Sequence, residues 1–144
     1  MNTTAHQTDK IGQMEKTTIL VAVNDIFFYT KVRDALRANG YTIEKARTQQ
    51  DIADKASSIS PSIVILDMND MALNSLQALD TLKADSRLNT IPTLAFANHE
   101  EVETWHRARA LGVTKIVSRN EFSARTRELV EEVLNSPDFQ TNNK

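Results

Sequence analysis

The sequence contains no cysteine, and only three glycines and three prolines occur among its 144 residues. Without cysteine there is no disulfide framework and no thiolate that could bind a metal or act as a nucleophile. The glycines, Gly12, Gly40 and Gly112, are too far apart to form a dinucleotide-binding fingerprint or a phosphate-binding loop. These absences exclude the commonest nucleotide-binding motifs of α/β proteins.

Long hydrophobic runs are also scarce. The longest unbroken apolar run covers residues 19–23 and is far too short to span a bilayer. Residues 1–16 contain no apolar stretch like that of a signal peptide, so we expect a cytoplasmic protein with no membrane contact. Lysine and arginine number 17 and aspartate and glutamate 19, a formal net charge of −2. Nucleic-acid-binding domains are usually clearly basic, so the charge argues against nucleic acid as a partner.

The composition is that of one globular domain. Hydrophobic residues make up 40% and charged residues 25% of the sequence, close to the averages of soluble globular proteins. A length of 144 residues suits a single hydrophobic core. The two ends, residues 1–16 and 136–144, are polar and aperiodic, and we interpret them as a flexible arm and a flexible tail. The domain is therefore expected to cover residues 17–135.

Between the two ends, apolar strand-like runs alternate with amphipathic helical patterns. This alternation predicts an α/β protein with a parallel sheet that is covered by helices on both faces. Because crossovers between parallel strands are right-handed, the doubly wound, flavodoxin-like strand order 2-1-3-4-5 is favoured. Strands are expected at residues 17–23, 41–46, 63–66, 93–97 and 115–118, and helices at residues 25–39, 49–59, 73–84, 100–111 and 122–135.

The carboxyl ends of the predicted strands are the places to look for a functional site, because ligands of doubly wound folds bind there. Asp67 directly follows a buried central run, and we prefer a functional role for it over simple loop capping. Asn24 and Asp25 stand where the first helix begins, and helix capping alone explains one of them. The residues at these strand ends include Asn24, Asp25, Asp67, Ala97, Asn98, Ser118 and Arg119.

This arrangement resembles the receiver domains of response regulators in two-component signalling, over about residues 17–134. The segment SPSIVILDMND is similar to the third strand and phosphoacceptor loop of that family, with Asp67 at the acceptor position. The segments RLNTIPTLAFA and RARALGVTKIVSR also resemble family segments. The resemblance implies the predicted fold and a phosphoryl group that a histidine kinase transfers to Asp67.

The resemblance also implies a magnesium ion, which the acceptor and two adjacent acids after the first strand bind in that family. Here those two places hold either Val23 and Asn24 or, after a shift of one residue, Asn24 and Asp25. At least one acid is therefore missing, and Asp67, Asn24, Asp25 and Asn69 remain as candidate ligands. Because Mg²⁺ prefers charged oxygen ligands, we predict weak binding, in the millimolar range or worse.

Three further positions depart from the family pattern. The hydroxyl residue after the fourth strand, the aromatic residue on the fifth strand and the lysine after it are replaced by Ala97, Ile116 and Arg119. Arg119 keeps the positive charge, and it either contacts a phosphoryl group or forms an inactive ion pair with Asp67. Without the hydroxyl and the ring, phosphorylation is expected to change the face of the fourth and fifth helices little.

We therefore expect a stand-alone, non-enzymatic receiver-like module of the pseudo-receiver type, with a degenerate phosphorylation site, that acts through protein–protein contact. The alternative is a conventional receiver that a histidine kinase phosphorylates on Asp67. A third, weaker hypothesis is a small nucleic-acid-binding domain that uses the basic stretch 107–127. An independent enzyme is disfavoured because no nucleophile stands beside a base.

The expected partner is another signalling protein, a histidine kinase or a second copy of the chain. Contact is predicted on the face formed by the fourth helix, the fifth strand and the fifth helix, which carries charges of both signs. Phe27 points away from the apolar stripe of the first helix, and we expect it to be exposed near the rim of the site. The candidate contact residues of the predicted face are Trp105, Arg107, Ile116 and Arg125.

Overall fold

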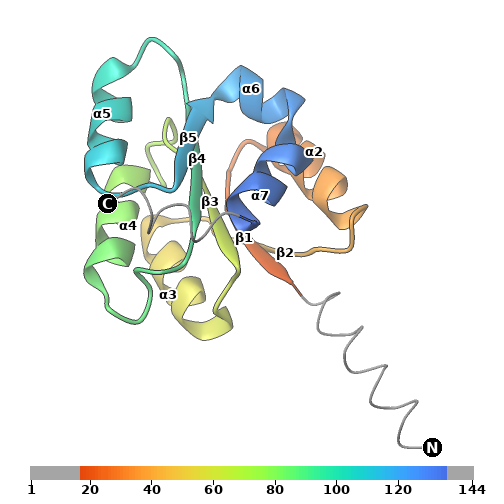
Figure 1. Cartoon of the computed structure of the whole chain (residues 1–144), viewed down its shortest axis with the longest axis horizontal. Coiled ribbons are helices and arrows are strands. Elements are labelled where there is room, and N and C mark those ends of the chain that lie inside the picture. The colour runs from red at the N-terminus through yellow and green to blue at the C-terminus, as the bar shows by residue number, and fades with distance from the viewer. Residues whose placement is uncertain (1–16, 136–144) are drawn as a thin grey trace, which may run out of the picture.

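Five parallel strands form one sheet in the order β2-β1-β3-β4-β5, which confirms the predicted topology (Figure 1). The computed structural model describes residues 17–135, so the predicted arm 1–16 and tail 136–144 lie outside the described residues. The strands are β1 (Thr18–Ala22), β2 (Thr42–Lys45), β3 (Ile63–Asp67), β4 (Thr93–Ala97) and β5 (Lys115–Ser118).

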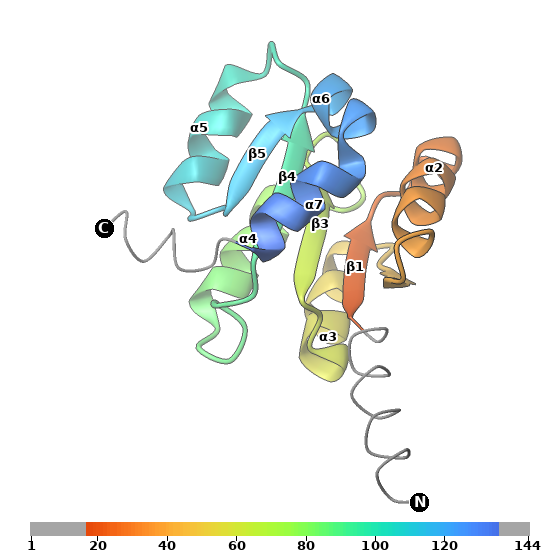
Figure 2. The same ribbon diagram turned by 45° about the vertical axis from the view of Figure 1, so that its right-hand side comes forward.

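Helices cover both faces of this sheet, in a single three-layered domain (Figures 1 and 2). One apolar cluster joins the sheet to α3, α4 and α5, and a second joins its other face to α2, α6 and α7. The bounds of the helices are α2 (Ile26–Arg37), α3 (Gln49–Ile59), α4 (Ser75–Ala84), α5 (Val102–Ala110), α6 (Arg119–Ala124) and α7 (Thr126–Leu134).

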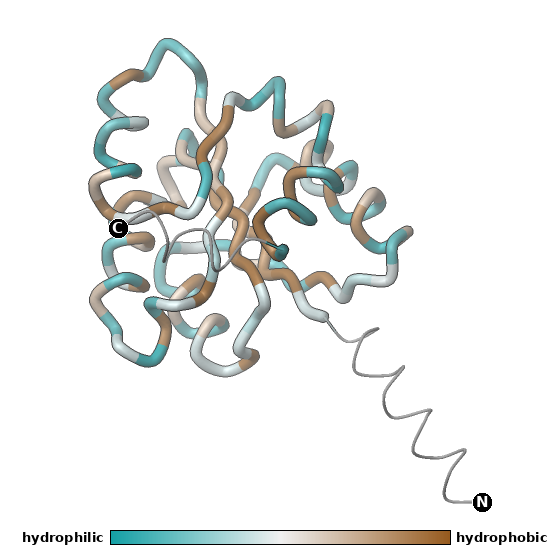
Figure 3. The backbone as a smooth tube through the Cα atoms, in the orientation of Figure 1, coloured by the Kyte–Doolittle hydropathy of each residue, from teal (hydrophilic) through white to brown (hydrophobic). Residues whose placement is uncertain are grey.

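The central strands are buried on both faces, as expected for a parallel sheet between two layers of helices. All five residues of β3 and all five of β4 are buried. Side chains alternate between the layers, so Leu20 and Ala22 join the first cluster while Ile19 and Val21 join the second. Figure 3 shows this distribution, with hydrophobic segments along the strands and hydrophilic segments on the outer turns of the helices.

The register of the sheet aligns the ends of its middle strands. Asp67 at the end of β3 is paired with Phe96 of β4, and Ala97 at the end of β4 is paired with Ser118 of β5. The loops that follow these strands therefore start at one edge of the sheet. None of the helices in the described range 17–135 is long and apolar enough to cross a membrane.

The helical segment predicted at residues 122–135 is wrong in its boundaries, because two helices occupy this region. Ser118 caps α6 directly after β5, since its Oγ accepts a hydrogen bond from the Glu121 amide at 3.0 Å. Arg125 then leaves the helical region, with φ −130° and ψ 35°, before α7 begins. This change of direction lets α6 lie at the end of the sheet while α7 runs back across its face (Figure 2).

Candidate functional site

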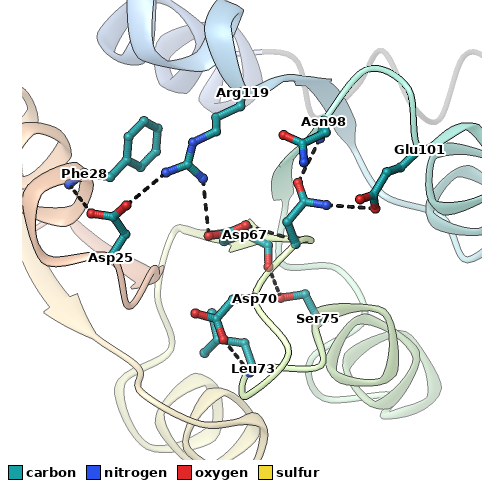
Figure 4. A network of polar contacts seen from close by, with 10 residues as sticks. Asp25, Phe28, Asp67, Asp70, Leu73, Ser75, Asn98, Glu101 and Arg119 are labelled. Carbon is teal, nitrogen blue, oxygen red and sulfur yellow. Dashed lines mark hydrogen bonds and ion pairs between the residues drawn. The ribbon is translucent and has the colours of Figure 1, made fainter.

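Asp67 lies at the carboxyl end of the central strand, as predicted, and its side chain is already engaged on both oxygens (Figure 4). Oδ1 accepts a hydrogen bond of 2.9 Å from the Asn69 amide, and Oδ2 lies 3.7 Å from Nη1 of Arg119. The residue is only 4% exposed. The Ser75 hydroxyl donates a 2.7 Å hydrogen bond to the main-chain carbonyl of Asp67, which ties the strand end to the start of α4.

The surroundings of Asp67 act on its pKa in both directions. Burial is the largest effect and raises the pKa of this carboxyl above its ordinary value. The hydrogen bond from the Asn69 amide and the charge of Arg119 lower the pKa, while the charges of Asp70 and Asp25 raise it. Because burial prevails, the negative charge at this position is disfavoured in spite of the arginine beside it.

Asp25 caps a helix, as was considered for it, and also forms an ion pair with Arg119. It precedes α2 and caps it, because Oδ1 accepts a hydrogen bond of 3.0 Å from the Phe28 amide. Its other oxygen, Oδ2, lies 3.3 Å from Nη2 of Arg119. The capping geometry thus fixes the carboxylate so that it also adds a negative charge to the site.

Asn24 is used differently from its neighbour. Its side-chain amide donates a 3.0 Å hydrogen bond to the main-chain carbonyl of Arg47, which precedes α3. Asn24 therefore ties the loop after β1 to the loop after β2. Among the described residues, the side chain of Asn24 makes no hydrogen bond to Asp67 or Arg119.

Arg119 is held at the centre of the site by the start of α6. It is the first residue of that helix and directly follows β5. Its two terminal nitrogens contact different carboxylates, Asp25 and Asp67. The guanidinium also lies 4.2 Å from the ring centre of Phe28 and 5.6 Å from that of Phe96. The predicted proximity of Arg119 and Asp67 is confirmed, whereas the ring contacts could not be predicted from the sequence pattern.

A second polar network leads from the loop after β3 to α5. The side-chain oxygen of Asn69 accepts a 2.8 Å hydrogen bond from the Asn98 amide, and its nitrogen donates one of 2.8 Å to Glu101. Trp105 donates a 3.0 Å hydrogen bond from Nε1 to the Asn98 carbonyl. Glu101 was missed at the sequence level, although its place shortly after the fourth strand was a usable signal.

Ala97 and Ile116, the two positions where the resemblance implied a hydroxyl and an aromatic ring, are both buried by packing. Ala97 is fully buried at the end of β4, and Ile116 of β5 is 8% exposed. Both belong to the apolar cluster against which the half-buried Trp105 packs. The prediction that Ile116 lies on an exposed partner face is therefore corrected, because its side chain points into the layer below α5.

The predicted partner face carries charges that are largely satisfied within the chain. Arg107 is exposed on α5 and makes no ion pair with other described residues. Lys115 of β5 lies 3.7 Å from Glu132. The Arg125 guanidinium contacts three acids of α6 and α7 at 2.6 to 3.3 Å: Glu121, Glu128 and Glu132.

The residues as arranged do not fit a magnesium ion. The described residues 17–135 contain no group of three or more acidic, histidine or cysteine side chains that could hold a metal. Asp25 and Asp67 both contact the Arg119 guanidinium, and the side-chain amide of Asn69 is bound to Asn98 and Glu101. Mg²⁺ usually binds proteins through one or two carboxylates together with waters, and here both carboxylates are paired with the guanidinium of Arg119.

The strand order and the two layers of helices are those of the receiver fold. No protein-family model matches the sequence, and no curated protein is detectably similar to it. Similar solved structures include a response-regulator receiver domain from Bermanella marisrubri, with 18% identity, 83% of this chain and 99% of that chain covered, and a TM-score of 0.75. The chemotaxis protein CheY4 of Vibrio cholerae has 18% identity, coverages of 82% and 98%, and a TM-score of 0.73.

A third similar structure is the signal receiver domain of a histidine kinase from Syntrophus aciditrophicus, with 18% identity, coverages of 82% and 89%, and a TM-score of 0.74. At this level of identity the likeness establishes the receiver fold of the chain.

Proposed function

We propose that the chain is a receiver-like signalling module that has a degenerate phosphorylation site and acts through contact with another protein rather than as an independent enzyme. The observation that carries this proposal is the burial of Asp67 and the pairing of both its side-chain oxygens. The carboxylate at the acceptor position is almost completely buried, and each of its oxygens has a partner, in Asn69 and Arg119.

Phosphoryl transfer needs an acceptor oxygen that is free to attack and positive groups that stabilise the charge on the phosphoryl oxygens. In this site, the positive charge of Arg119 is already shared between Asp25 and Asp67. Ala97 offers no hydroxyl that could donate to a phosphoryl oxygen. Both features favour a slow transfer and a weakly held phosphoryl group.

Exposed apolar side chains support a function through protein contact. Ile26 and Phe27 at the start of α2 are 58% and 85% exposed, and Met71 in the loop after β3 is 93% exposed. Val102 at the start of α5 is 55% exposed. Contiguous exposed apolar groups mark interaction surfaces, and Ile26 and Phe27, which are adjacent at the start of α2, are the side chains that we assign to such a surface. Phe27 is exposed, as its place outside the apolar stripe predicted, and Arg107 adds an exposed charge on α5 that has no ion pair among the described residues.

The proposal is tested by incubating the protein with Mg²⁺ and a small acyl phosphate, followed by intact-mass measurement. We expect no added phosphoryl group that depends on Asp67, so wild type and Asp67→Asn should give the same mass profile. Asp70→Asn is the matched control, because Asp70 lies in the same loop and its Oδ1 caps the Leu73 amide at 3.2 Å.

A conventional receiver phosphorylated by a histidine kinase is the second candidate function. The position of Asp67 at the end of β3, within 3.7 Å of a cationic side chain, favours it. A phosphoryl group that is added to the wild type and to Asp70→Asn, but not to Asp67→Asn, would establish this function in place of the first.

A further inference from the structure

We propose that the guanidinium of Arg119 is the resident cation of this site and takes the position between Asp25 and Asp67 that a divalent metal ion would need. The inference deepens the proposed function and rests on it, because it gives the degenerate site a specific property, namely independence from metal. It is carried by the geometry around one side chain (Figure 4).

The guanidinium joins two carboxylates that come from different parts of the chain. Nη2 lies 3.3 Å from Oδ2 of Asp25 in the loop after β1, and Nη1 lies 3.7 Å from Oδ2 of Asp67 on β3. The remaining oxygen of each carboxylate accepts a main-chain hydrogen bond, from Phe28 and Asn69 respectively. A metal ion that binds both carboxylates therefore has to displace the guanidinium.

Aromatic rings hold the guanidinium where it is. Its carbon lies 4.2 Å from the centre of the Phe28 ring and 5.6 Å from that of Phe96. The rings are themselves fixed, since Phe28 and Phe96 are 5.1 Å apart and Phe96 stacks on Phe122 at 4.7 Å. A planar guanidinium stacks on such rings and contacts two carboxylates at once, which a lysine ammonium does less well.

The consequence for metal binding follows from charge. A divalent ion and a guanidinium repel each other at contact distance, so the metal and Arg119 compete for the same two carboxylates. Metal binding to the wild type is weakened by the ion pairs and ring contacts that have to be broken. Removal of the arginine charge frees both carboxylates, and metal affinity should then rise.

The competition is measured with Mn²⁺, a hard divalent ion that broadens the NMR signals of nearby amides. Wild type, Arg119→Met, Arg119→Lys and Arg107→Met are titrated, and the amides of Met68 and Asn69 are followed. Arg107→Met is the matched control, since it removes the same charge from an exposed residue on α5. We expect Mn²⁺ to bind Arg119→Met at least tenfold more tightly than wild type, Arg119→Lys to be intermediate, and Arg107→Met to equal wild type.

Equal affinities for wild type and both Arg119 variants would overturn the inference, as would site-specific broadening of the wild type at micromolar Mn²⁺. If Arg119→Met does not fold, the wild-type titration and Arg119→Lys decide the question. The titration uses neither a phosphodonor nor a partner protein. Phosphorylation of the wild type on Asp67 would therefore refute the proposed function without deciding the outcome of the metal titration. Equal Mn²⁺ affinities of wild type and the Arg119 variants would refute the inference about Arg119 without deciding whether Asp67 is phosphorylated.

Discussion

Asn69 and Glu101 are joined by a 2.8 Å hydrogen bond between the side-chain amide of the first and Oε1 of the second. This contact connects the loop after β3 to the residue that precedes α5. The main-chain amide of Asn69 meanwhile contacts Asp67 itself. A single residue therefore fixes the carboxylate of Asp67 and anchors the neighbouring loop.

Replacement of Asn69 by alanine tests this anchoring role. The change removes two side-chain hydrogen bonds, to Asn98 and to Glu101, and each such bond contributes roughly 0.5–1.5 kcal/mol. We expect the free energy of unfolding, measured with urea, to fall by about 1–3 kcal/mol. Asn89→Ala is the control, because Asn89 is exposed and its side chain has no hydrogen-bond partner among the described residues. A loss for Asn69→Ala no larger than that for Asn89→Ala would contradict the role.

The raised pKa of Asp67 predicts a dependence of stability on pH. Burial raises this pKa above that of the same carboxyl in the unfolded chain. Between the two pKa values the folded protein binds more protons than the unfolded chain, so the free energy of unfolding decreases as the pH rises through this window. Above the folded pKa, the buried charge destabilises the protein, and acidification relieves this contribution.

Asp67→Asn should therefore have a higher melting temperature than wild type at neutral pH, and the difference should shrink as the pH falls. Thermal unfolding from neutral to mildly acidic pH measures both quantities. Asp80→Asn, at an exposed position of α4, is the control and should show no such narrowing. A lower melting temperature of Asp67→Asn at neutral pH would mean that the ion pair with Arg119 outweighs burial.

Substitution of two phenylalanines, one buried and one exposed, is expected to change the free energy of unfolding by very different amounts. Phe122 is fully buried, so Phe122→Ala should lower the free energy of unfolding by about 3–5 kcal/mol. Phe27 is 85% exposed, and Phe27→Ser should change it by less than about 0.5 kcal/mol. Urea unfolding of both variants checks this prediction. Strong destabilisation by Phe27→Ser would show that this side chain is part of the fold rather than of an interaction surface.

The sequence predicted the layers of the fold because hydrophobic periodicity records which side of each element is buried. The runs at residues 93–97 and 115–118 coincide with β4 and β5, and the stripe that includes Phe122, Leu129 and Val133 is buried as expected. The meeting of Asp67 and Arg119 followed from topology alone, since parallel strands bring their carboxyl ends to one edge. Local pattern and connectivity were sufficient for these features.

Features that depend on tertiary geometry could not be predicted in this way. The break at Arg125 leaves the apolar stripe intact, so periodicity alone suggested one uninterrupted helix. Ile116 belongs to the predicted partner face because that face includes the fifth strand, yet α5 covers the side of β5 on which Ile116 lies. The contact between Phe28 and Arg119 joins residues that only the folded sheet brings together. The hydrogen bonds of Asn98 use its main chain, which residue type does not reveal.

The last prediction concerns what a phosphoryl group on Asp67 would do. A ligand shifts a conformational equilibrium only as far as it binds one state more tightly than the other. Ala97 has no hydroxyl to draw towards a phosphoryl group, and Ile116 already fills its place in the cluster beneath α5. Arg119 is able to respond, but its contacts with Asp25 and Phe28 keep that response near α2 and away from α5.

The substitution Asp67→Ala, and a phosphoryl mimic such as beryllofluoride at concentrations high enough to occupy the site, should therefore shift amide NMR signals near Asp67, Asp25 and Arg119 but leave those of α5 and β5 almost unchanged. Asn69→Ala serves as the positive control, because it removes the hydrogen bond to Glu101 directly before α5 and should shift the α5 signals. If the α5 signals move with the mimic as far as they move in Asn69→Ala, then the Asn69 contacts transmit the state of Asp67. In that case the face around Trp105 and Arg107 would be under the control of Asp67 in spite of Ala97 and Ile116.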